Sequence, residues 1–324
     1  MTMKRLILSV ALIAIGAALP GAVWAQKYPV KSVRLLVGFP PGGGTDLIAR
    51  LVAQKLTAAL GQPVVVENRP GASANIAAEI AAKAAPDGYT LLFGNSSLSI
   101  SPAVFSKLNY DPVKDLVPIS MASSYPFVLV AHPSLPVRNV RELVALAKAR
   151  PGELDYASAG AGTMSHLAME LLRLRTGIKV GHLPYKGAAP VLVAVLAGEA
   201  PAAFIVVPVA GPQVKAGKLR GLGVASPTRS AVIPDTPTMT EAGIQGHEAV
   251  QWNGLFAPAR TPQAILDLLH AEMAKAVTSP ELRQRFDAEG AVAVGNSPAE
   301  FGAYFRAEAE KWADVAKRSG TRLD

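Results

Sequence analysis

The chain has 324 residues, no cysteine and a formal net charge of +8 at pH 7, and 50% of its residues are hydrophobic. The absence of cysteine excludes disulfide bonds, thiolate metal sites and cysteine nucleophiles. Lysine and arginine are spread singly, without the basic clusters and interleaved aromatic residues that nucleic-acid binding needs. Nucleic acid is therefore not an expected partner, and the positive charge favours an acidic small molecule only weakly.

Residues 1–25 have the layout of an export signal. Lys4 and Arg5 provide a positive start, and residues 6–19 form an apolar stretch that is too short to span a bilayer comfortably. Ala25 precedes a suitable cleavage point, so we expect a mature chain that starts near Gln26. Such a chain is exported to the periplasm and does not span the membrane after processing. The alternative interpretation is an uncleaved N-terminal anchor.

The remainder of the chain, about 300 residues, is more than one hydrophobic core usually holds, so two domains are expected. Short apolar runs alternate with longer Ala- and Leu-rich stretches at helical spacing. In chain order, we predict strands at residues 32–39, 63–67, 89–93, 127–130, 154–157, 180–183, 202–207, 219–225 and 250–257, and helices at residues 46–60, 71–85, 164–175, 188–197, 262–277 and 298–318. This alternation predicts an α/β fold with mostly parallel sheets flanked by helices.

The segment GFPPGGGTD at residues 38–46 joins the first predicted strand to the first predicted helix. A phosphate loop needs a lysine directly after its last glycine, and Gly43 is followed by Gly44 and Thr45 instead. A nucleotide site is therefore not expected. Three glycines let backbone N–H groups approach a ligand closely, and a helix start suits one carboxylate. We expect Thr45 or Asp46 to cap the helix, with a contact from Asp46 to water or a ligand hydroxyl as the alternative.

A second glycine loop, SAGAGT at residues 158–163, repeats the strand, loop and helix pattern in the second half of the chain. In open α/β sheets, ligands bind at the carboxyl ends of strands, where such loops gather. A tight turn with nothing bound is the alternative for either loop taken alone. One loop in each half predicts a ligand cleft between two domains.

Catalytic and metal-binding patterns are poorly supported. The segment GASAN fails as a G-x-S-x-G nucleophile elbow, because Asn75 takes its last position. The 5 histidines lack the spacings of metal sites, so no metal, cofactor or catalytic residue is predicted. His166 and Glu170 are four residues apart, and we expect an ordinary surface or helix-start interaction between them. His182 is expected to be packed or hydrogen-bonded, and Lys186 to be exposed or at the cleft edge.

Several segments resemble one protein family over nearly the whole mature chain. They are YPVKSVRLLVGFPPGGGTD, GQPVVVENRPGA, PDGYTLLFGNSS, the strand and proline segment at residues 127–133, YASAGAGTMSHLA, HLPYKGAAP, KAGKLRGLGVASPTRS, IPDTPTMTEAGI and WNGLFAPARTP. In number, order and spacing, these segments resemble the substrate-binding receptors of tripartite tricarboxylate transporters, the Bug receptors.

The resemblance implies a two-domain periplasmic binding protein of the Venus-flytrap type, type II-like, which closes on its ligand. It implies that the chain crosses between the domains near residue 125 and returns near residue 245. The first domain then comprises residues 27–125 and 246–324, and the second comprises residues 126–245. The proline-rich residues 110–136 agree with such a crossing. We expect a monomer that binds a di- or tricarboxylate or an aromatic carboxylate and works with transporter membrane subunits.

Carried over residue by residue, the resemblance implies ligand contacts in both domains. These contacts are Phe39, Gly43, Gly44, Thr45, Asp46, Asn95, Ser96 and Ser97 in the first domain, and Ser158, Gly160, Gly162, Thr163 and Tyr185 in the second. Family members typically hold a carboxylate through backbone amides and bridging waters of the first loop. This implication agrees with the site predicted from the glycines and the helix start.

One position departs from the family pattern. Phe204 is followed by Ile205, whereas the family usually has Phe-Asp-Asn or a near relative there. If Ile205 lines the cleft, an acidic or amide contact becomes apolar, and a carboxylate with a hydrophobic body is expected over an amino acid. The sequence thus predicts a receptor that captures a small organic carboxylate for a membrane permease. A sensor that feeds a signalling partner is one alternative, and a secreted hydrolase or isomerase is another, for which no nucleophile with its base is found.

Overall fold

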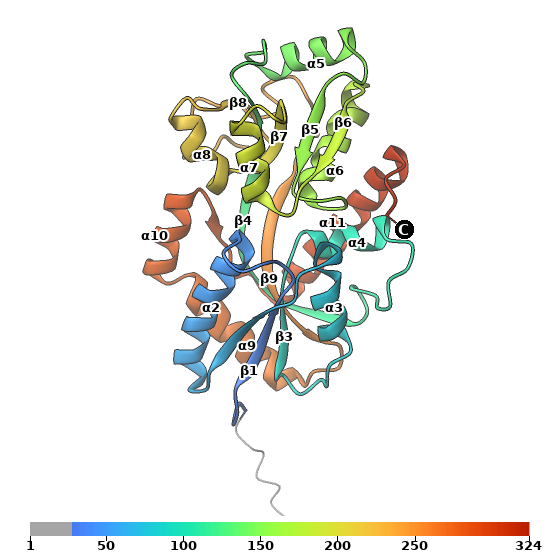
Figure 1. Cartoon of the computed structure of the whole chain (residues 1–324). Coiled ribbons are helices and arrows are strands. Elements are labelled where there is room, and N and C mark those ends of the chain that lie inside the picture. The colour runs from blue at the N-terminus through green and yellow to red at the C-terminus, as the bar shows by residue number, and fades with distance from the viewer. Residues whose placement is uncertain (1–27, 324) are drawn as a thin grey trace, which may run out of the picture.

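The chain forms two lobes that are joined by two long strands (Figure 1). This computed structural model describes residues 28–323, so the predicted export signal lies outside the described residues. No helix within residues 28–323 is long and apolar enough to cross a lipid bilayer.

The first lobe is built on three parallel strands with β1 in the middle. The strands are β1 (Val33–Val37), β2 (Val64–Asn68) and β3 (Thr90–Asn95). Helices α2 (Gly44–Leu60), α3 (Asn75–Ala82) and α4 (Ser97–Val104) follow these strands in turn, and a 3-10 turn, η2 (Ala72–Ala74), precedes α3. The C-terminal elements α9 (Gln263–Val277), α10 (Pro280–Glu289), β10 (Val292–Ala293) and α11 (Pro298–Ser319) complete this lobe. Strand β1 is apolar and buried except at the exposed Arg34, because helices cover both faces of a parallel sheet.

The second lobe repeats this construction. Its parallel strands are β5 (Asp155–Ser158), β6 (Gly181–Pro184) and β7 (Ala202–Val206), with β5 between the other two. Its helices are α5 (Val140–Ala149), α6 (Met164–Thr176), α7 (Ala188–Leu196) and α8 (Val207–Lys215), and β8 (Arg220–Val224) follows α8. The carboxyl ends of β1, β3 and β5 all turn towards the junction of the lobes (Figure 1).

The two lobes share one mixed sheet because β4 (Leu116–Ala131) and β9 (Val250–Pro258) run through both. These strands pair antiparallel with each other, β9 also pairs with β3, and residues 127–131 of β4 pair with β7. The strand order is β2-β1-β3-β9-β4-β7-β5-β6. The predicted α/β fold with parallel strands in each half is confirmed, and the joining ladder is antiparallel. The domain boundaries near residues 125 and 245 stay a prediction.

Helix α11 also connects the lobes through the hydrophobic core. Phe301 and Phe305, near its start, pack in the core of the first lobe. Trp312 and Val315, near its end, pack in a cluster that contains Leu167 of α6 in the second lobe. The helix has 22 residues and therefore spans about 33 Å, enough to reach both lobes.

Several observed elements were not predicted. Helix α4 contains Pro102 and three serines, and α8 contains Pro212, so neither has a helical propensity pattern. Tertiary packing overrides weak propensity at such segments. Helices α5 and α10 and strand β10 were also not predicted. The helix predicted at residues 71–85 is divided, because residues 72–74 have positive φ. Strand β4 has 16 residues, far more than the short strand predicted at residues 127–130.

Candidate ligand-binding site

The first glycine loop joins β1 to α2 and is held by the side chain of Asp46. Gly42 has φ 81°, a left-handed backbone that glycine adopts without strain. The Gly42 N–H and Arg50 Nε each donate to Asp46 Oδ2 at 2.9 Å. Asn68 Nδ2 donates to Asp46 Oδ1 at 2.8 Å and to the Phe39 carbonyl oxygen at 2.9 Å. These bonds fix both ends of the loop to the first turn of α2.

Asp46 is only 1% exposed, and its carboxylate remains charged inside the protein. Burial alone would raise the pKa of Asp46, but hydrogen bonds from Arg50, Asn68 and the Gly42 N–H lower that pKa below its ordinary value. The predicted helix cap from Thr45 or Asp46 is wrong. Gly43 is the N-cap residue of α2, without a side-chain cap, because Asp46 turns back to the loop instead.

The polar residues that follow β3 are buried beside the first loop. Asn95 Nδ2 donates to Thr45 Oγ1 at 3.3 Å, and Asn95 Oδ1 accepts from the Ser97 N–H at 3.0 Å. Ser96 Oγ donates to Gln251 Oε1 of β9 at 2.9 Å. Asn95, Ser96 and Ser97 are at most 5% exposed. They support the start of α4 and the loop above it, and their direct contact with a ligand stays a prediction.

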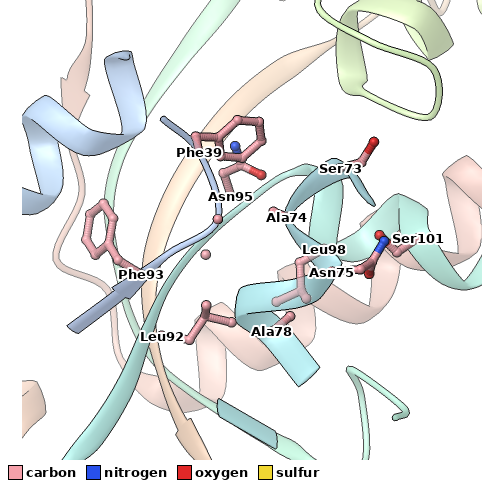
Figure 2. A pocket seen from close by; sticks show the side chains of 12 residues that line it. Phe39, Ser73, Ala74, Asn75, Ala78, Leu92, Phe93, Asn95, Leu98 and Ser101 are labelled. Atoms are coloured by element: carbon pink, nitrogen blue, oxygen red, sulfur yellow. The ribbon is translucent and has the colours of Figure 1, made fainter. Parts of the chain in front are cut away.

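A narrow pocket lies at the carboxyl ends of β1 and β3, beside η2 (Figure 2). Its cavity volume is about 10 Å³, room for a single water molecule in this closed arrangement. It is lined by Gly38, Phe39, Ser73, Ala74, Asn75, Ala78, Leu92, Phe93, Gly94, Asn95, Leu98 and Ser101. Phe39 and Asn95 belong to the predicted site, whereas the residues of η2 were missed by sequence reasoning.

The η2 turn has an unusual backbone. Ala72, Ser73 and Ala74 have φ of 46°, 53° and 77°, a left-handed region that costs a residue with a Cβ atom about 1–2 kcal/mol. Such strain persists only where surrounding contacts hold it, and it is common at ligand clamps. The sequence contains no glycine or asparagine at these three positions that could have signalled the turn.

The second glycine loop joins β5 to α6. Gly160 and Gly162 have φ of 136° and 72°, so both positions favour glycine. The Gly160 N–H donates to Ser158 Oγ at 3.2 Å, and Thr163 Oγ1 donates to the Gly160 carbonyl oxygen at 2.7 Å. The Gly162 N–H donates to His166 Nδ1 at 3.1 Å. Helix α6 begins after Thr163 without a side-chain cap, so its first-turn N–H groups are not bonded to the side chain of the N-cap residue.

The two lobes meet at these loops. Ser73 Oγ of η2 donates to the carbonyl oxygen of Ala161, in the middle of the second loop, at 2.8 Å. Figure 2 shows the Ser73 hydroxyl pointing away from the pocket that η2 lines. A Cβ atom added to Gly162 would lie 2.6 Å from Leu323 Cδ1 and 3.0 Å from Val104 Cγ2. The second loop therefore packs directly against the first lobe.

Two further predicted residues differ in their placement. Tyr185 is half-buried, and its N–H donates to the Ser158 carbonyl oxygen at 2.8 Å, so it adjoins the second loop. Ile205 is 1% exposed and packs in the core between β7 and helices α7 and α8. The expected apolar wall is therefore not formed by Ile205, because strand alternation turns its side chain into the core. Val206 is half-buried and packs against clusters of both lobes.

The structure also contains a contact between a serine and a histidine that sequence reasoning missed. Ser158 Oγ lies 2.6 Å from His182 Nε2, although Ser158 is 0% exposed. His182 is packed and hydrogen-bonded, as predicted. His166 Nε2 and Glu170 Oε1 lie 3.8 Å apart at the start of α6, so the predicted helix-start interaction is confirmed, whereas the surface alternative is wrong because the two residues are 7% and 3% exposed. Lys186 is exposed, as predicted.

The chain is similar to known binding proteins over most of its length. The family model described as "Tripartite tricarboxylate transporter family receptor" matches residues 48–320. Protein BugT of Bordetella pertussis is 37% identical over 325 residues, which cover 100% of both chains.

Solved structures are similar in fold and sequence. R. palustris Rpa4515 with adipate is 35% identical, with a TM-score of 0.84 over 90% of this chain and 98% of that chain. MatC (Rpa3494) from Rhodopseudomonas palustris with bound malate is 32% identical, with a TM-score of 0.83 over 89% and 99%. Together with the family model, these similarities agree with the resemblance found in the sequence. The chain belongs to the tripartite tricarboxylate transporter receptor family.

Proposed function

We propose that this chain is a periplasmic receptor that captures a small organic carboxylate between its two glycine loops and delivers it to a membrane transporter. The observation that carries the proposal is the hydrogen bond of 2.8 Å between Ser73 and Ala161, which joins the pocket of the first lobe to the second loop. A ligand held beside this contact touches both lobes, so its binding favours the closed arrangement over an open one.

Backbone N–H groups supply the affinity for an anion. Helices α2 and α6 start at the two loops without side-chain caps, so their first-turn N–H groups and partial positive charge suit a carboxylate. Asp46 does not oppose this, because its carboxylate is paired with Arg50 and hydrogen-bonded to Asn68. A dicarboxylate can direct one carboxylate to each helix start.

The relatives support a dicarboxylate ligand. The structures of Rpa4515 with adipate and of MatC with bound malate both contain four- to six-carbon diacids. Membership of a transporter receptor family supports a periplasmic location and a partnership with transporter membrane subunits. The proposed protein is a monomer whose domains, residues 27–125 with 246–324 and residues 126–245, close on the ligand.

The site favours a ligand with an apolar body over an amino acid. Phe39 lines the pocket, and Val206 is half-buried where the cores of the lobes meet. The ammonium group of aspartate would lose hydration beside such side chains without gaining a charged partner there. The apolar surface in this proposal comes from Phe39 and Val206, because Ile205 is buried in the core.

The predicted site residues divide into two groups by their burial. Direct contact is proposed for Phe39, Gly43, Gly44, Gly160 and Tyr185, which are exposed or half-buried. Support of the loops is proposed for the buried residues, whose polar atoms bond within the protein: Thr45, Asp46, Asn95, Ser96, Ser97, Ser158, Gly162 and Thr163.

A thermal-shift screen tests the ligand class. Adipate at 100 times its dissociation constant stabilises the folded state by about 2.7 kcal/mol, which raises the melting temperature measurably. We expect adipate and malate to raise it, aspartate to raise it less, and neutral sugars to leave it unchanged. Stabilisation by sugars or nucleotides but by no carboxylate contradicts the proposal.

Replacing Gly43 by leucine tests whether the first loop approaches the ligand. Gly43 has φ −75°, and a Cβ atom there would lie at an ordinary 3.5 Å from the Pro40 carbonyl oxygen, so the fold tolerates a side chain. We expect Gly43→Leu to weaken adipate binding at least tenfold in calorimetry. The matched control Ala271→Leu, at an exposed position of α9, should bind like the unmodified protein. If the two variants bind adipate with equal affinity, the first loop does not contact the ligand.

The pair of Ser158 and His182 is the observation that keeps a hydrolase as an alternative function. Ser158 is fully buried, and its hydroxyl is occupied by the loop, which opposes attack on a substrate. Incubating the protein with adipate and its monoethyl ester, followed by NMR of the mixture, separates the two functions. A receptor leaves both compounds unchanged, whereas ester turnover that Ser158→Ala abolishes supports the hydrolase. A sensor that reports the bound state to a signalling partner is a further alternative.

A further inference from the structure

Two stacked histidines lie directly beneath the second glycine loop. The rings of His166 in α6 and His182 in β6 are 4.0 Å apart between centroids, with an interplanar angle of 6°. Tyr156 of β5 stacks on His182 at 5.0 Å and 18°. Each histidine makes one hydrogen bond to the loop, from Gly162 to His166 Nδ1 at 3.1 Å and between Ser158 and His182 Nε2 at 2.6 Å.

Hydrogen-bond geometry determines the protonation of His166. A backbone N–H is always a donor, so His166 Nδ1 must be an unprotonated acceptor and the ring must carry its proton on Nε2. Adding a second proton would place an N–H on Nδ1, facing the N–H of Gly162. Two donors would then face each other, and the bond that fixes Gly162 would be lost.

His182 contacts the second loop through the hydroxyl of Ser158. Ser158 Oγ accepts the Gly160 N–H at 3.2 Å. Two acceptors lie within reach of the Ser158 proton: the Gly160 carbonyl oxygen at 3.2 Å, which also accepts from Thr163 at 2.7 Å, and His182 Nε2. The Ser158 proton is therefore best directed to His182 Nε2, the nearer acceptor at 2.6 Å. Protonated His182 could instead donate to Ser158, so this bond would reverse without breaking.

Burial, more than the surrounding charges, keeps both rings neutral. Burial lowers the pKa of His166 to about 4, and the positive charge of Arg173 acts in the same direction. Burial, His166 and Arg173 lower the pKa of His182 to about 4, against the opposing charge of Glu170. Glu170 is itself occupied by two bonds of 2.7 Å from Arg173 and one of 3.0 Å from the hydroxyl of Tyr156.

We propose that His166 and His182 are positioning residues that hold the second ligand loop as uncharged hydrogen-bond acceptors, and that protonation of His166 releases Gly162. The loop's part in ligand capture rests on the proposed function, whereas its dependence on the histidines does not. The loop is then fixed above about pH 6 and loosens as the pH falls towards 4.

Nuclear magnetic resonance of the ligand-free protein tests the loop directly. The amide resonances of Gly160 and Gly162 should shift between pH 6 and pH 4, together with the ring signals of the two histidines. In His166→Asn, the side-chain oxygen can accept from Gly162 but cannot be protonated, so the Gly162 shift should disappear. A Gly162 resonance that is independent of pH in the unmodified protein, or that titrates in His166→Asn, overturns the proposal.

Affinity for adipate, measured by calorimetry from pH 8 to pH 4, tests the consequence for binding. At pH 7.5 we expect about a tenfold loss in His166→Ala, which leaves Gly162 unpaired, and near-normal affinity in His166→Asn. His182→Gln keeps an acceptor for Ser158 and should bind better than His182→Ala. On acidification to pH 4, the unmodified protein should lose about twofold more affinity than His166→Asn.

The protonation of adipate itself affects the measured affinity of every variant in the same way. Comparing the variants at each pH therefore cancels this effect. His132→Gln removes a histidine that contacts Ser134, outside the cluster, and should follow the unmodified protein. Equal affinity of His166→Ala and His166→Asn, or a gain of affinity in the unmodified protein relative to His166→Asn at pH 4, overturns the proposal. If adipate does not bind at all, the proposed ligand class fails, and the amide titration still tests the histidines.

Discussion

Asp46 is a negative residue inside a site that is proposed to hold an anion. Its two oxygens accept hydrogen bonds from Gly42, Arg50 and Asn68, so it acts on the loop rather than on the ligand. The pKa of Asp46 is lowered, so its contribution to stability is present above pH 3.8, its ordinary value, and is lost as the pH falls below that. Single residues in this site therefore differ in role according to which polar atoms are already bonded.

Replacing Asp46 by alanine should destabilise the protein more than replacing its partner. Asp46→Ala removes the acceptor of the Gly42 N–H and one of the two acceptors of Asn68 Nδ2, which should cost about 1–3 kcal/mol in urea unfolding. Arg50 is 50% exposed, so Arg50→Ala should cost less than about 1 kcal/mol. If both variants lose equal stability, the ion pair rather than the loop bonds explains the burial of Asp46.

At the scale of elements, η2 combines backbone strain with a position between the lobes. Three consecutive residues with a Cβ atom are left-handed, and the central one, Ser73, makes the hydrogen bond to the second loop. The side chain of Ala74 packs so closely that a Cβ atom on Gly38 would lie 2.3 Å from it. The turn is therefore held by close packing on one side and by the second lobe on the other.

Relief of this strain is measurable. Ala74→Gly should stabilise the protein by about 1 kcal/mol in urea unfolding, because glycine adopts φ 77° without a steric penalty. The control Ala58→Gly, at an exposed position inside helix α2, should destabilise it by about 1 kcal/mol. A loss of stability in both variants would show that the turn is not strained.

For the whole molecule, the proposed closure depends on contacts that cross between the lobes. The hydrogen bond from Ser73 to Ala161 is such a contact at the cleft, whereas α11 packs on both lobes beside it. Strands β4 and β9 continue through both lobes and keep them attached during any change of angle. The cleft bond can therefore break without loss of the cores.

Ser73→Ala should favour an open arrangement. Loss of one neutral hydrogen bond, about 0.5–1.5 kcal/mol, should weaken adipate binding roughly two- to tenfold with little change in unfolding free energy. Small-angle X-ray scattering should show a larger radius of gyration for the ligand-free variant. Ser99→Ala removes a serine-to-carbonyl bond from α4 to Ser96, the N-cap residue of the same helix, and serves as the matched control. Identical scattering and affinity in both variants would contradict a role in closure.

Sequence reasoning recovered the residues whose role depends on local pattern. The strand, glycine loop and helix units at residues 38–46 and 158–163 were predicted, because strand and helix periodicities and glycines are local signals. The left-handed turn at Ala72–Ala74 and the stack of His166 on His182 were missed. Neither has a local signal, since alanine and serine rarely adopt positive φ and the two histidines belong to different elements.

The sequence by itself determined the α/β class, the two glycine loops and the family, because these depend on residue order and spacing along the chain. Only the tertiary structure decided which polar atoms remain available in the site. It turned Asp46 towards Gly42, buried Ile205 in a core and brought Ser73 to Ala161. These outcomes depend on which side chains meet across the sheet and between the lobes, and such long-range contacts are not written in any short stretch of sequence.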